Sequence, residues 1–225
     1  MKTIFTAATL LLVASSAGAQ EKPTWSITPV LGSFIPTSNL GSVPGANPET
    51  DGGIGLRTDA SPLFGVAIER GVRGSRFALR TQLLFAPATG AVAERHVGEE
   101  SCGENCFKML YDRETLASGS TALGTLDLVF RPLEAWRVRP YVVAGAGLRR
   151  YSVEDGELEP KFADAFTQDR TGVIGHVGLG AAVHARRAEF RVEVGDYFGR
   201  HRVGEARPWR AHELSTTVGL TIPLP

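Results

Sequence analysis

The stretch from Arg139 to Tyr151 alternates strictly between two kinds of side chain, and no other feature of the chain constrains its fold as strongly. One set is apolar: Val142, Ala144, Ala146 and Leu148. The other set mixes an aromatic residue, glycines and a charge: Tyr141, Val143, Gly145, Gly147 and Arg149. Because successive side chains of a strand point to opposite faces, this period of two predicts a strand with one apolar face. Tyr141 and Tyr151 lie about ten positions apart, the spacing of two aromatic girdles along a tilted membrane strand.

The same alternation recurs along the chain, and we predict about eight strands in all. The predicted strands are Trp25–Phe34, Phe64–Glu69, Phe77–Phe85, Thr121–Phe130, Arg139–Tyr151, Val173–Val183, Glu189–Val194 and Glu213–Ile222. The charged residues on the face opposite the apolar one are Glu69, Arg80, Asp127, Arg149, Arg191 and Glu193. A lipocalin would reverse these faces, because its interior is apolar to hold a ligand.

The connections between these strands alternate between long and short. The long ones are predicted to be polar loops at residues 36–61, 89–117, 151–171 and 199–211, with one or two helical turns at residues 161–167. A soluble sandwich gives turns of more regular length. Bacterial outer-membrane barrels have short turns on one side and long loops on the other. The sequence therefore predicts an all-β fold, an eight-stranded antiparallel up-and-down transmembrane β-barrel with short periplasmic turns and long extracellular loops.

The first residues have the three-part layout of a secretory signal peptide rather than of a buried helix. Met1-Lys2 gives a positive start, Ile4–Ala14 is apolar, and Ala17-Gly18-Ala19 reads as a cleavage site. We predict a signal peptide at residues 1–19 and an outer-membrane barrel domain at residues 20–225. No later stretch has the roughly 18 apolar residues of a membrane helix. The formal net charge of zero gives no reason to expect a nucleic-acid partner.

A set of motifs within the predicted strands carries a resemblance to a known family. The motifs are Pro140-Tyr141 with Gly145-x-Gly147 and Tyr151, then Gly172-x-x-Gly175-x-x-Gly178-x-Gly180, and Thr217–Ile222. They resemble the small bacterial outer-membrane β-barrel family with OmpA-like and OmpX-like barrel domains. The resemblance implies outer-membrane lipid and the barrel assembly machinery as partners. The family usually ends its last strand in an aromatic residue, where this chain has Pro223-Leu224-Pro225.

The cysteines form one closely spaced pair, Cys102 and Cys106, in a predicted outer loop. In an exported protein such a pair predicts a disulfide, which here would close a very short loop and shape its tip. Two ligands do not make a tetrahedral zinc site. A redox role would need a different spacing and a supporting fold.

The charges on the inward faces form a nearly matched set. Its members are Arg80, Arg149 and Arg191 with Glu69, Asp127, Glu193 and Glu213. Side chains fill an eight-stranded barrel, and buried charges there must be paired or would each cost several kcal/mol. We predict a structural lattice of ion pairs that plugs the interior. The alternative is a path for protons or ions through the same residues.

His176, Glu213 and Ser215 are predicted to point inward near the outer mouth. Because these residue types also serve in acyl transfer, the alternative function is a lipid-modifying barrel enzyme of acyltransferase or deacylase type. However, the two strands that carry them are second neighbours, about 10 Å apart, and a triad needs hydrogen-bond contact. His184 lies about 26 Å along the strand from His176, too far for a shared metal. We expect no catalytic residue, cofactor or metal.

Arginines also gather on the side of the predicted extracellular loops. The candidates for contact with lipopolysaccharide phosphates are Arg150, Arg200, Arg202, Arg207 and Arg210. Arginine binds phosphate bidentately, which favours such a contact. A solvated loop with local ion pairs is the alternative. The sequence thus predicts a non-enzymatic protein of the bacterial outer membrane with a structural or surface-interaction role; it does not identify a ligand of its loops.

Overall fold

The structure is a computed structural model that describes most of the chain after the predicted signal peptide. The described residues are 25–37, 41–43, 54–72, 75–103, 106–133, 137–153, 171–185, 188–201 and 209–224. Within these ranges, the side chains at 41–43, 54–57, 91, 93–103, 106–117, 153, 185, 201 and 209 are outside the description. The predicted signal peptide and the helical turns predicted at 161–167 both lie outside the described residues. The described part of the chain contains no helix of the length and apolarity that would span a membrane.

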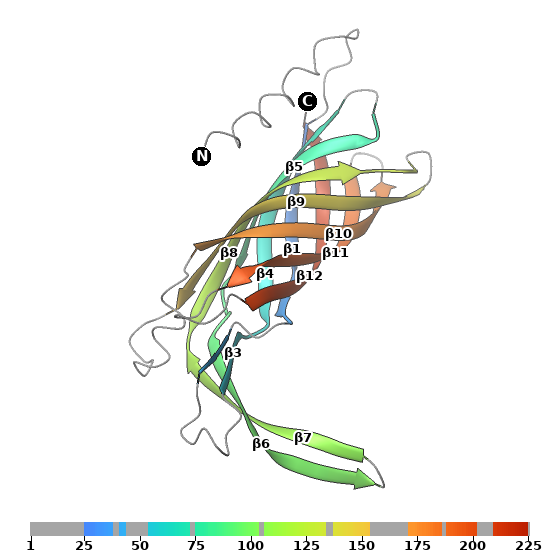
Figure 1. The fold of residues 1–225 in the computed structure, drawn as a ribbon. Coiled ribbons are helices and arrows are strands. Elements are labelled where there is room, and N and C mark those ends of the chain that lie inside the picture. The colour runs from blue at the N-terminus through green and yellow to red at the C-terminus, as the bar shows by residue number, and fades with distance from the viewer. Residues whose placement is uncertain are drawn as a thin grey trace.

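Eight strands pair edge to edge and close into a barrel (Figure 1). They are β1 (Trp25–Pro36), β4 (Ser61–Gly71), β5 (Phe77–Ala86), β8 (Gly119–Phe130), β9 (Val138–Val153), β10 (Thr171–Ala185), β11 (Ala188–His201) and β12 (Trp209–Leu224). Their order around the barrel is β1-β12-β11-β10-β9-β8-β5-β4, and β1 pairs antiparallel with both β12 and β4. The predicted closed, eight-stranded antiparallel barrel is confirmed.

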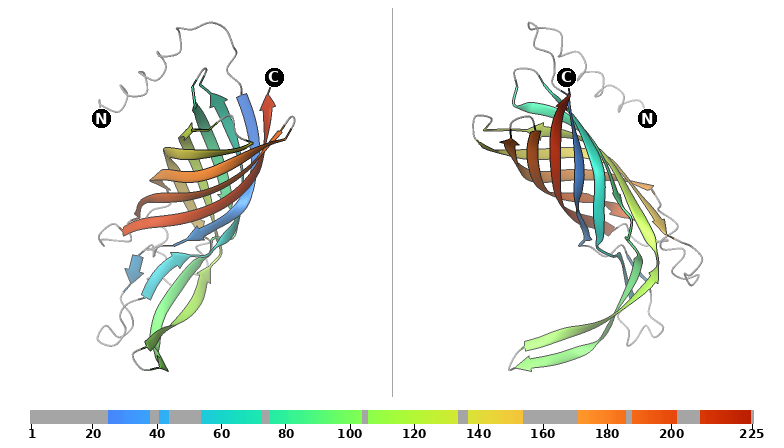
Figure 2. Two further views of the ribbon diagram at one scale, coloured as in Figure 1. Left: turned by 90° about the vertical axis from the view of Figure 1, so that its right-hand side faces the viewer. Right: turned by 180° about the vertical axis from the view of Figure 1, so that it is seen from behind.

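A second sheet continues from one end of the barrel, where the sequence predicted loops. It consists of β2 (Gly41–Val43), β3 (Ile54–Thr58), β6 (Ala91–Gly103) and β7 (Cys106–Ala117), in the order β2-β3-β6-β7. Figure 2 shows that β6 and β7 extend away from the barrel at the end opposite the start of β1. The prediction of loops at 36–61 and 89–117 was wrong for these segments. Their backbone pairing needs no alternation of apolar residues, because such alternation arises only where one face meets a core or lipid.

Two barrel strands are longer than their sequence pattern predicted. β11 continues to His201 and β12 begins at Trp209, so the loop predicted at 199–211 is shorter than expected. Arg200 and Arg210 therefore lie on strands and are directly opposite each other in the register. The hydrogen bonding of both strands extends beyond the apolar alternation, and for this reason the sequence ended β11 too early and began β12 too late.

The two faces of each barrel strand have opposite surroundings, as the alternation predicted. In β9, Val142, Ala144, Ala146 and Leu148 are exposed on the outer wall, whereas Val143 and Arg149 are buried inside. The exposed fraction is 56% for Leu148 and 0% for Val143. Large apolar side chains are exposed in the same way on the other barrel strands, including Leu83 and Leu179. The outer wall of the barrel is therefore predominantly apolar.

The prediction of a charge lattice implied a uniformly polar interior. The structure shows that the interior also contains two apolar clusters. One cluster includes Val30, Phe34, Leu63, Ala67, Leu84, Ala86, Leu123, Ile174 and Tyr197. The other consists of Ala78, Val129, Tyr141, Val143 and Ala182. Apolar side chains at inward positions thus fill part of the barrel alongside its charges.

Tyr141 and Tyr151 do not form girdles on the outer wall, and that prediction was wrong. Both side chains are buried in the interior, with exposed fractions of 2% and 4%. Their odd numbers place them on the same face of β9 as Arg149, which points inward. The alternation of side chains, and not the ten-residue spacing of the two tyrosines, therefore decides which way they point. Gly180 makes room for one of them, because a Cβ atom there would lie only 2.2 Å from Cζ of Tyr141.

Candidate functional site

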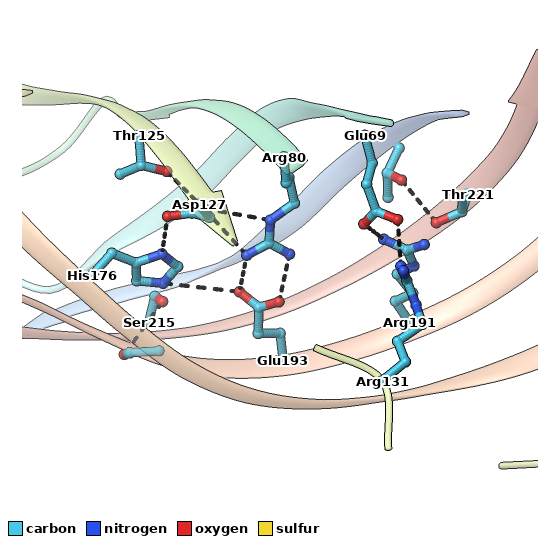
Figure 3. Close-up of polar contacts among 12 residues, drawn as sticks. Glu69, Arg80, Thr125, Asp127, Arg131, His176, Arg191, Glu193, Ser215 and Thr221 are labelled. Atoms are coloured by element: carbon cyan, nitrogen blue, oxygen red, sulfur yellow. Dashed lines mark hydrogen bonds and ion pairs between the residues drawn. The ribbon is translucent and has the colours of Figure 1, made fainter. Parts of the chain in front are cut away.

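The seven charged residues predicted to line the interior are all buried within the barrel. They come from six of its strands: Glu69 from β4, Arg80 from β5, Asp127 from β8, Arg149 from β9, Arg191 and Glu193 from β11, and Glu213 from β12. The structure distributes them over three groups, two of which are visible in Figure 3. Each group contains at least one arginine and one carboxylate in direct contact.

The middle group is built around Arg80. Its guanidinium forms two bonds with the Glu193 carboxylate, Nη1 to Oε2 at 2.7 Å and Nη2 to Oε1 at 2.9 Å. Its Nε lies 3.4 Å from Oδ2 of Asp127. That carboxylate also accepts a hydrogen bond of 2.9 Å from Oγ1 of Thr125 and lies 3.0 Å from Nδ1 of His176 (Figure 3). Two parallel bonds fix the orientation of Arg80 as well as neutralising it.

The second group surrounds Glu69, at the end of the barrel that carries the short connections. Oε2 of Glu69 accepts a bond of 2.8 Å from Nη1 of Arg191, and Oε1 contacts Arg131. Nε of Arg191 donates to Glu189 at 2.7 Å, and Arg139 lies 3.8 Å from the same carboxylate. Arg131, Arg139 and Glu189 were missed by the sequence analysis, because they lie at strand ends and in a turn where the alternation stops.

The third group joins Arg149 and Glu213 near the opposite end of the barrel. Nη1 of Arg149 lies 3.0 Å from Oε1 of Glu213, which also accepts a hydrogen bond from the hydroxyl of Tyr151. The guanidinium lies over the Tyr151 ring, 4.6 Å from its centroid. Both charged side chains are almost fully buried, so each needs the other in a region of low dielectric constant.

A small cavity separates the groups around Arg80 and Arg191. Its volume is about 20 Å³, and Gln82, Tyr141 and Glu193 contribute to its lining. Oε1 of Gln82 is buried there without a hydrogen-bond partner among the described residues. A polar cavity of this size holds about one water molecule. The side chains thus leave little free space in this part of the interior.

His176 and Ser215 come closer together than the spacing of their strands suggested. Gly195 lies between them on β11, and a Cβ atom there would be 2.8 Å from Nε2 of His176 and 3.2 Å from Oγ of Ser215. Nevertheless, Nε2 of His176 has no hydrogen-bond partner among the described residues, and Oγ of Ser215 donates to the Gly195 carbonyl at 3.5 Å. The acid beside His176 is Asp127 rather than Glu213. The described part of the chain contains no group of three or more potential metal ligands.

The candidate cysteines lie at the far end of the second sheet. Cys102 belongs to β6 and Cys106 begins β7, and Cys106 is opposite Gly103 in the register. Their side chains are outside the described residues, so the disulfide stays a prediction.

Three of the five candidate arginines for lipopolysaccharide contact are described, and all three are exposed on the outer wall. Arg150 is on β9, Arg200 on β11 and Arg210 on β12. None of them has an ion pair within the described part of the chain. Arg202 and Arg207 lie outside the described residues.

The sequence analysis missed a histidine–aspartate pair next to these arginines. Nδ1 of His212 lies 2.8 Å from Oδ2 of Asp196, and the His212 ring stacks on Phe198 with centroids 6.2 Å apart. The parity of the three residues gave a signal, because their even numbers place them on the outward face of β11 and β12.

The strand pairing and the two faces define the class of molecule: a closed, eight-stranded antiparallel barrel with an apolar outer wall and charges inside. No protein-family model matches the chain, and no curated protein matches it in sequence. Among solved structures it is similar to Neisserial surface protein A, NspA, with 10% identity and a TM-score of 0.49 over 90% of this chain and 99% of that chain.

It is also similar to Ail, the attachment invasion locus protein of Yersinia pestis, with 12% identity and a TM-score of 0.41 over 91% of this chain and 100% of that chain. A structure of Ail in complex with the heparin analogue sucrose octasulfate gives 13% identity and a TM-score of 0.36 over 90% and 100% of the two chains. The fold itself is defined by the strand pairing of this chain.

Proposed function

We propose that the mature chain is an integral, non-enzymatic protein of the bacterial outer membrane, with a plugged barrel and a structural or surface-interaction role. The observation that carries this proposal is the division of the barrel strands into an apolar exposed face and a polar or packed inner face. The exposed fraction reaches 66% for Leu179 and 73% for Val173 on the outer wall. Each large apolar side chain left in water would forgo about 1.5–3 kcal/mol of transfer free energy. Lipid around the wall removes that cost.

The closed strand order supports insertion into a membrane independently of the side chains. Backbone groups in lipid must find partners within the protein, and a closed barrel has no free strand edge. The barrel of this chain closes through the pairing of β1 with both β12 and β4. The location of the inner charges agrees with this, because an arginine on the lipid side near the midplane costs about 2–4 kcal/mol.

The test of membrane insertion is fractionation followed by electrophoresis of cold and boiled samples. We expect the protein in the outer-membrane fraction and a change in its mobility on boiling, since a folded barrel resists detergent until it is heated. Recovery as a soluble periplasmic protein without a mobility change would contradict the proposal.

A structural lattice that plugs the barrel is supported by the contacts of its charges. Arg80 is bound bidentately by Glu193, and Glu69 contacts two arginines. An eight-stranded barrel is only wide enough for its own side chains. We expect purified protein in planar bilayers to give little or no steady conductance. Large, stable, open channels would instead support the alternative of an ion path through the lattice.

The non-enzymatic assignment is supported by the burial of the residues that would perform acyl transfer. The side chain of His176 has an exposed fraction of 0%, and Ser215 is buried beside it. A lipid ester on the outer wall therefore has no access to either side chain. We expect lipid A acylation in cells to be the same with the wild-type protein and with Ser215→Ala. A change of acylation that depends on Ser215 would favour the enzyme instead.

A surface-interaction role is supported by the sheet formed by β2, β3, β6 and β7. It extends the molecule beyond the barrel at the end that carries the long connections (Figure 2). In an outer-membrane barrel this is the extracellular end. The expected partners are outer-membrane lipid, lipopolysaccharide and, for insertion, the barrel assembly machinery.

A further inference from the structure

His176 lies between the two carboxylates of the middle group, which is built around Arg80. Its Nδ1 lies 3.0 Å from Oδ1 of Asp127, and its Nε2 lies 3.9 Å from Oε1 of Glu193 (Figure 3). The ring stacks on that of Tyr197, with centroids 4.3 Å apart and planes inclined by 11°. The side chain is fully buried. The imidazole therefore meets a carboxylate with each of its nitrogens, away from water.

Two glycines provide the space for this arrangement. Gly145 lies between Asp127 and His176 in the register of β8, β9 and β10. A Cβ atom at Gly145 would be 2.1 Å from Oδ1 of Asp127. A Cβ atom at Gly195, on β11, would be 2.8 Å from Nε2 of His176. A side chain at either position would displace the carboxylate or the ring, so the strand pairing itself builds the site.

The middle group contains more carboxylates than arginines. Among the described residues, Arg80 is its one guanidinium, whereas Asp127 and Glu193 are two carboxylates. In the other two groups the arginines match or outnumber the carboxylates. With a neutral imidazole, the middle group would therefore hold one buried negative charge without a counter-charge, which is costly in a region of low dielectric constant. A proton on His176 brings the group to neutrality.

The geometry places this proton on the imidazole rather than on a carboxylate. Both oxygens of Glu193 accept hydrogen bonds from Arg80. Oδ2 of Asp127 accepts a hydrogen bond from Thr125 and also lies 3.4 Å from Nε of Arg80. In either neutral tautomer of His176, one nitrogen lone pair would face a carboxylate oxygen, and two acceptors repel each other. The imidazolium donates from both nitrogens.

We propose that His176 is a pH-sensitive switch in the barrel interior. Protonated, it completes the charge balance of the middle group; deprotonated, it leaves one carboxylate charge unbalanced. Histidine loses its proton between about pH 5 and 8. Because the folded contacts favour the protonated ring, the folded barrel binds a proton that the unfolded chain releases, and its stability falls as the pH rises through this range. This inference concerns the interior and goes beyond the proposed surface role.

The groups that face the ring come from five strands. The charged and titratable ones are Asp127 from β8, Glu193 and Tyr197 from β11, and Arg80 from β5. The adjacent positions of β9 and β12 are occupied by Gly145 and Ser215, which carry no charge.

The experiment measures the ratio of folded to unfolded protein in urea, with the full-length mature chain in detergent micelles, from about pH 6 to pH 8. We compare the wild type with His176→Gln, whose amide still donates to Asp127 but has no proton to lose. The matched control is His184→Gln, which removes an exposed histidine from the same strand. His212 and its contact with Asp196 are present in all three proteins, so their contribution cancels in the comparison.

We expect the folded-to-unfolded ratio of the wild type and of the control to fall by up to tenfold per pH unit towards the upper end of this range, as the release of one proton implies. In His176→Gln this part of the pH dependence should be absent. Equal pH dependence of the wild type and His176→Gln overturns the proposal.

A second variant changes the charge balance and retains the histidine. Asp127→Asn removes one negative charge, so Arg80 and Glu193 are balanced without a proton on His176, and the new amide can donate to Nδ1 of a neutral ring. We expect this variant also to lose the pH dependence. If the dependence persisted, the proton would not serve to neutralise the middle group.

Nitrogen-15 spectra of the histidine-labelled wild type test the switch without any variant, and therefore also if both variants fail to fold. The ring of His176 is assigned through its contact with Tyr197. We expect both ring nitrogens to carry a proton at the lower end of the pH range and only one at the upper end. A ring with a single proton throughout refutes the switch. Because these measurements use micelles, that result leaves the proposed outer-membrane location untouched.

Discussion

The arginines inside the barrel and those on its outer wall differ in whether the protein itself neutralises them. Arg80, Arg149 and Arg191 are buried, and each lies within 3.0 Å of a carboxylate oxygen. Arg200 and Arg210 are exposed and have no ion pair within the described part of the chain. The interior has a low dielectric constant and little water, so a charge there requires a partner from the same chain. We expect the outer rim to meet water and lipid headgroups, which would provide counter-charges from outside.

Removing one interior arginine should have the largest effect on stability. Arg80→Met leaves the carboxylates of Glu193 and Asp127 without their guanidinium, and we expect it to lower the free energy of unfolding by about 3–5 kcal/mol. The measurement is equilibrium unfolding in urea in lipid vesicles. As a control, Arg80→Met with Glu193→Leu should recover part of the loss, because one uncompensated charge is removed as well. A single variant as stable as the wild type would mean that the lattice does not neutralise buried charge.

Placing a new arginine on the lipid side of the wall should lower the free energy of unfolding slightly less than Arg80→Met does. Ala144 is exposed on the outer wall of β9, and Ala144→Arg puts a charge into lipid without a partner. We expect a loss of about 2–4 kcal/mol in the same unfolding assay. Ala144→Leu, which keeps the wall apolar, should stay within about 0.5 kcal/mol of the wild type. If the arginine were tolerated equally well, Ala144 would not face lipid.

Adding one carbon atom at Gly147, where β9 packs closely against β8, should lower the free energy of unfolding by less than the two changes above. A Cβ atom at Gly147 would lie 1.9 Å from the carbonyl oxygen of Gly124 on the neighbouring strand. We therefore expect Gly147→Ala to destabilise the barrel by about 1–3 kcal/mol. Gly172 is the matched control, since the nearest atom to its added Cβ is 3.9 Å away. Equal stability of the two alanine variants would show that β8 and β9 are less closely packed than described.

Removing the outer-wall arginines should have the smallest effect on folding. In vesicles of pure phosphatidylcholine, the double variant Arg200→Gln, Arg210→Gln should differ from the wild type by no more than about 0.5 kcal/mol, because no internal ion pair is lost. The relief of repulsion between the two charges acts in the stabilising direction. A loss comparable to that of Arg80→Met would mean that these arginines belong to the internal lattice, and the comparison drawn above would fail.

The sequence by itself determined the barrel strands, their two faces and seven of the charged residues of the interior. These are local properties, since the direction of a side chain in a strand follows from its parity alone. It did not determine the second sheet, because the polar composition of residues 36–61 and 89–117 predicted loops there. It also placed Tyr141 and Tyr151 on the wrong side by reading their spacing rather than their parity.

Only the tertiary structure decided which charges meet. Arg80 pairs with Glu193, 113 positions away, and Arg191 pairs with Glu69, 122 positions away. Neither pair lies on neighbouring strands, because β5 and β11 and likewise β4 and β11 face each other across the interior. The tilt and stagger with which the strands close the barrel set which inward side chains lie at the same level, and no single strand carries that information. The same register brought Arg200 opposite Arg210 and left that pair facing outward.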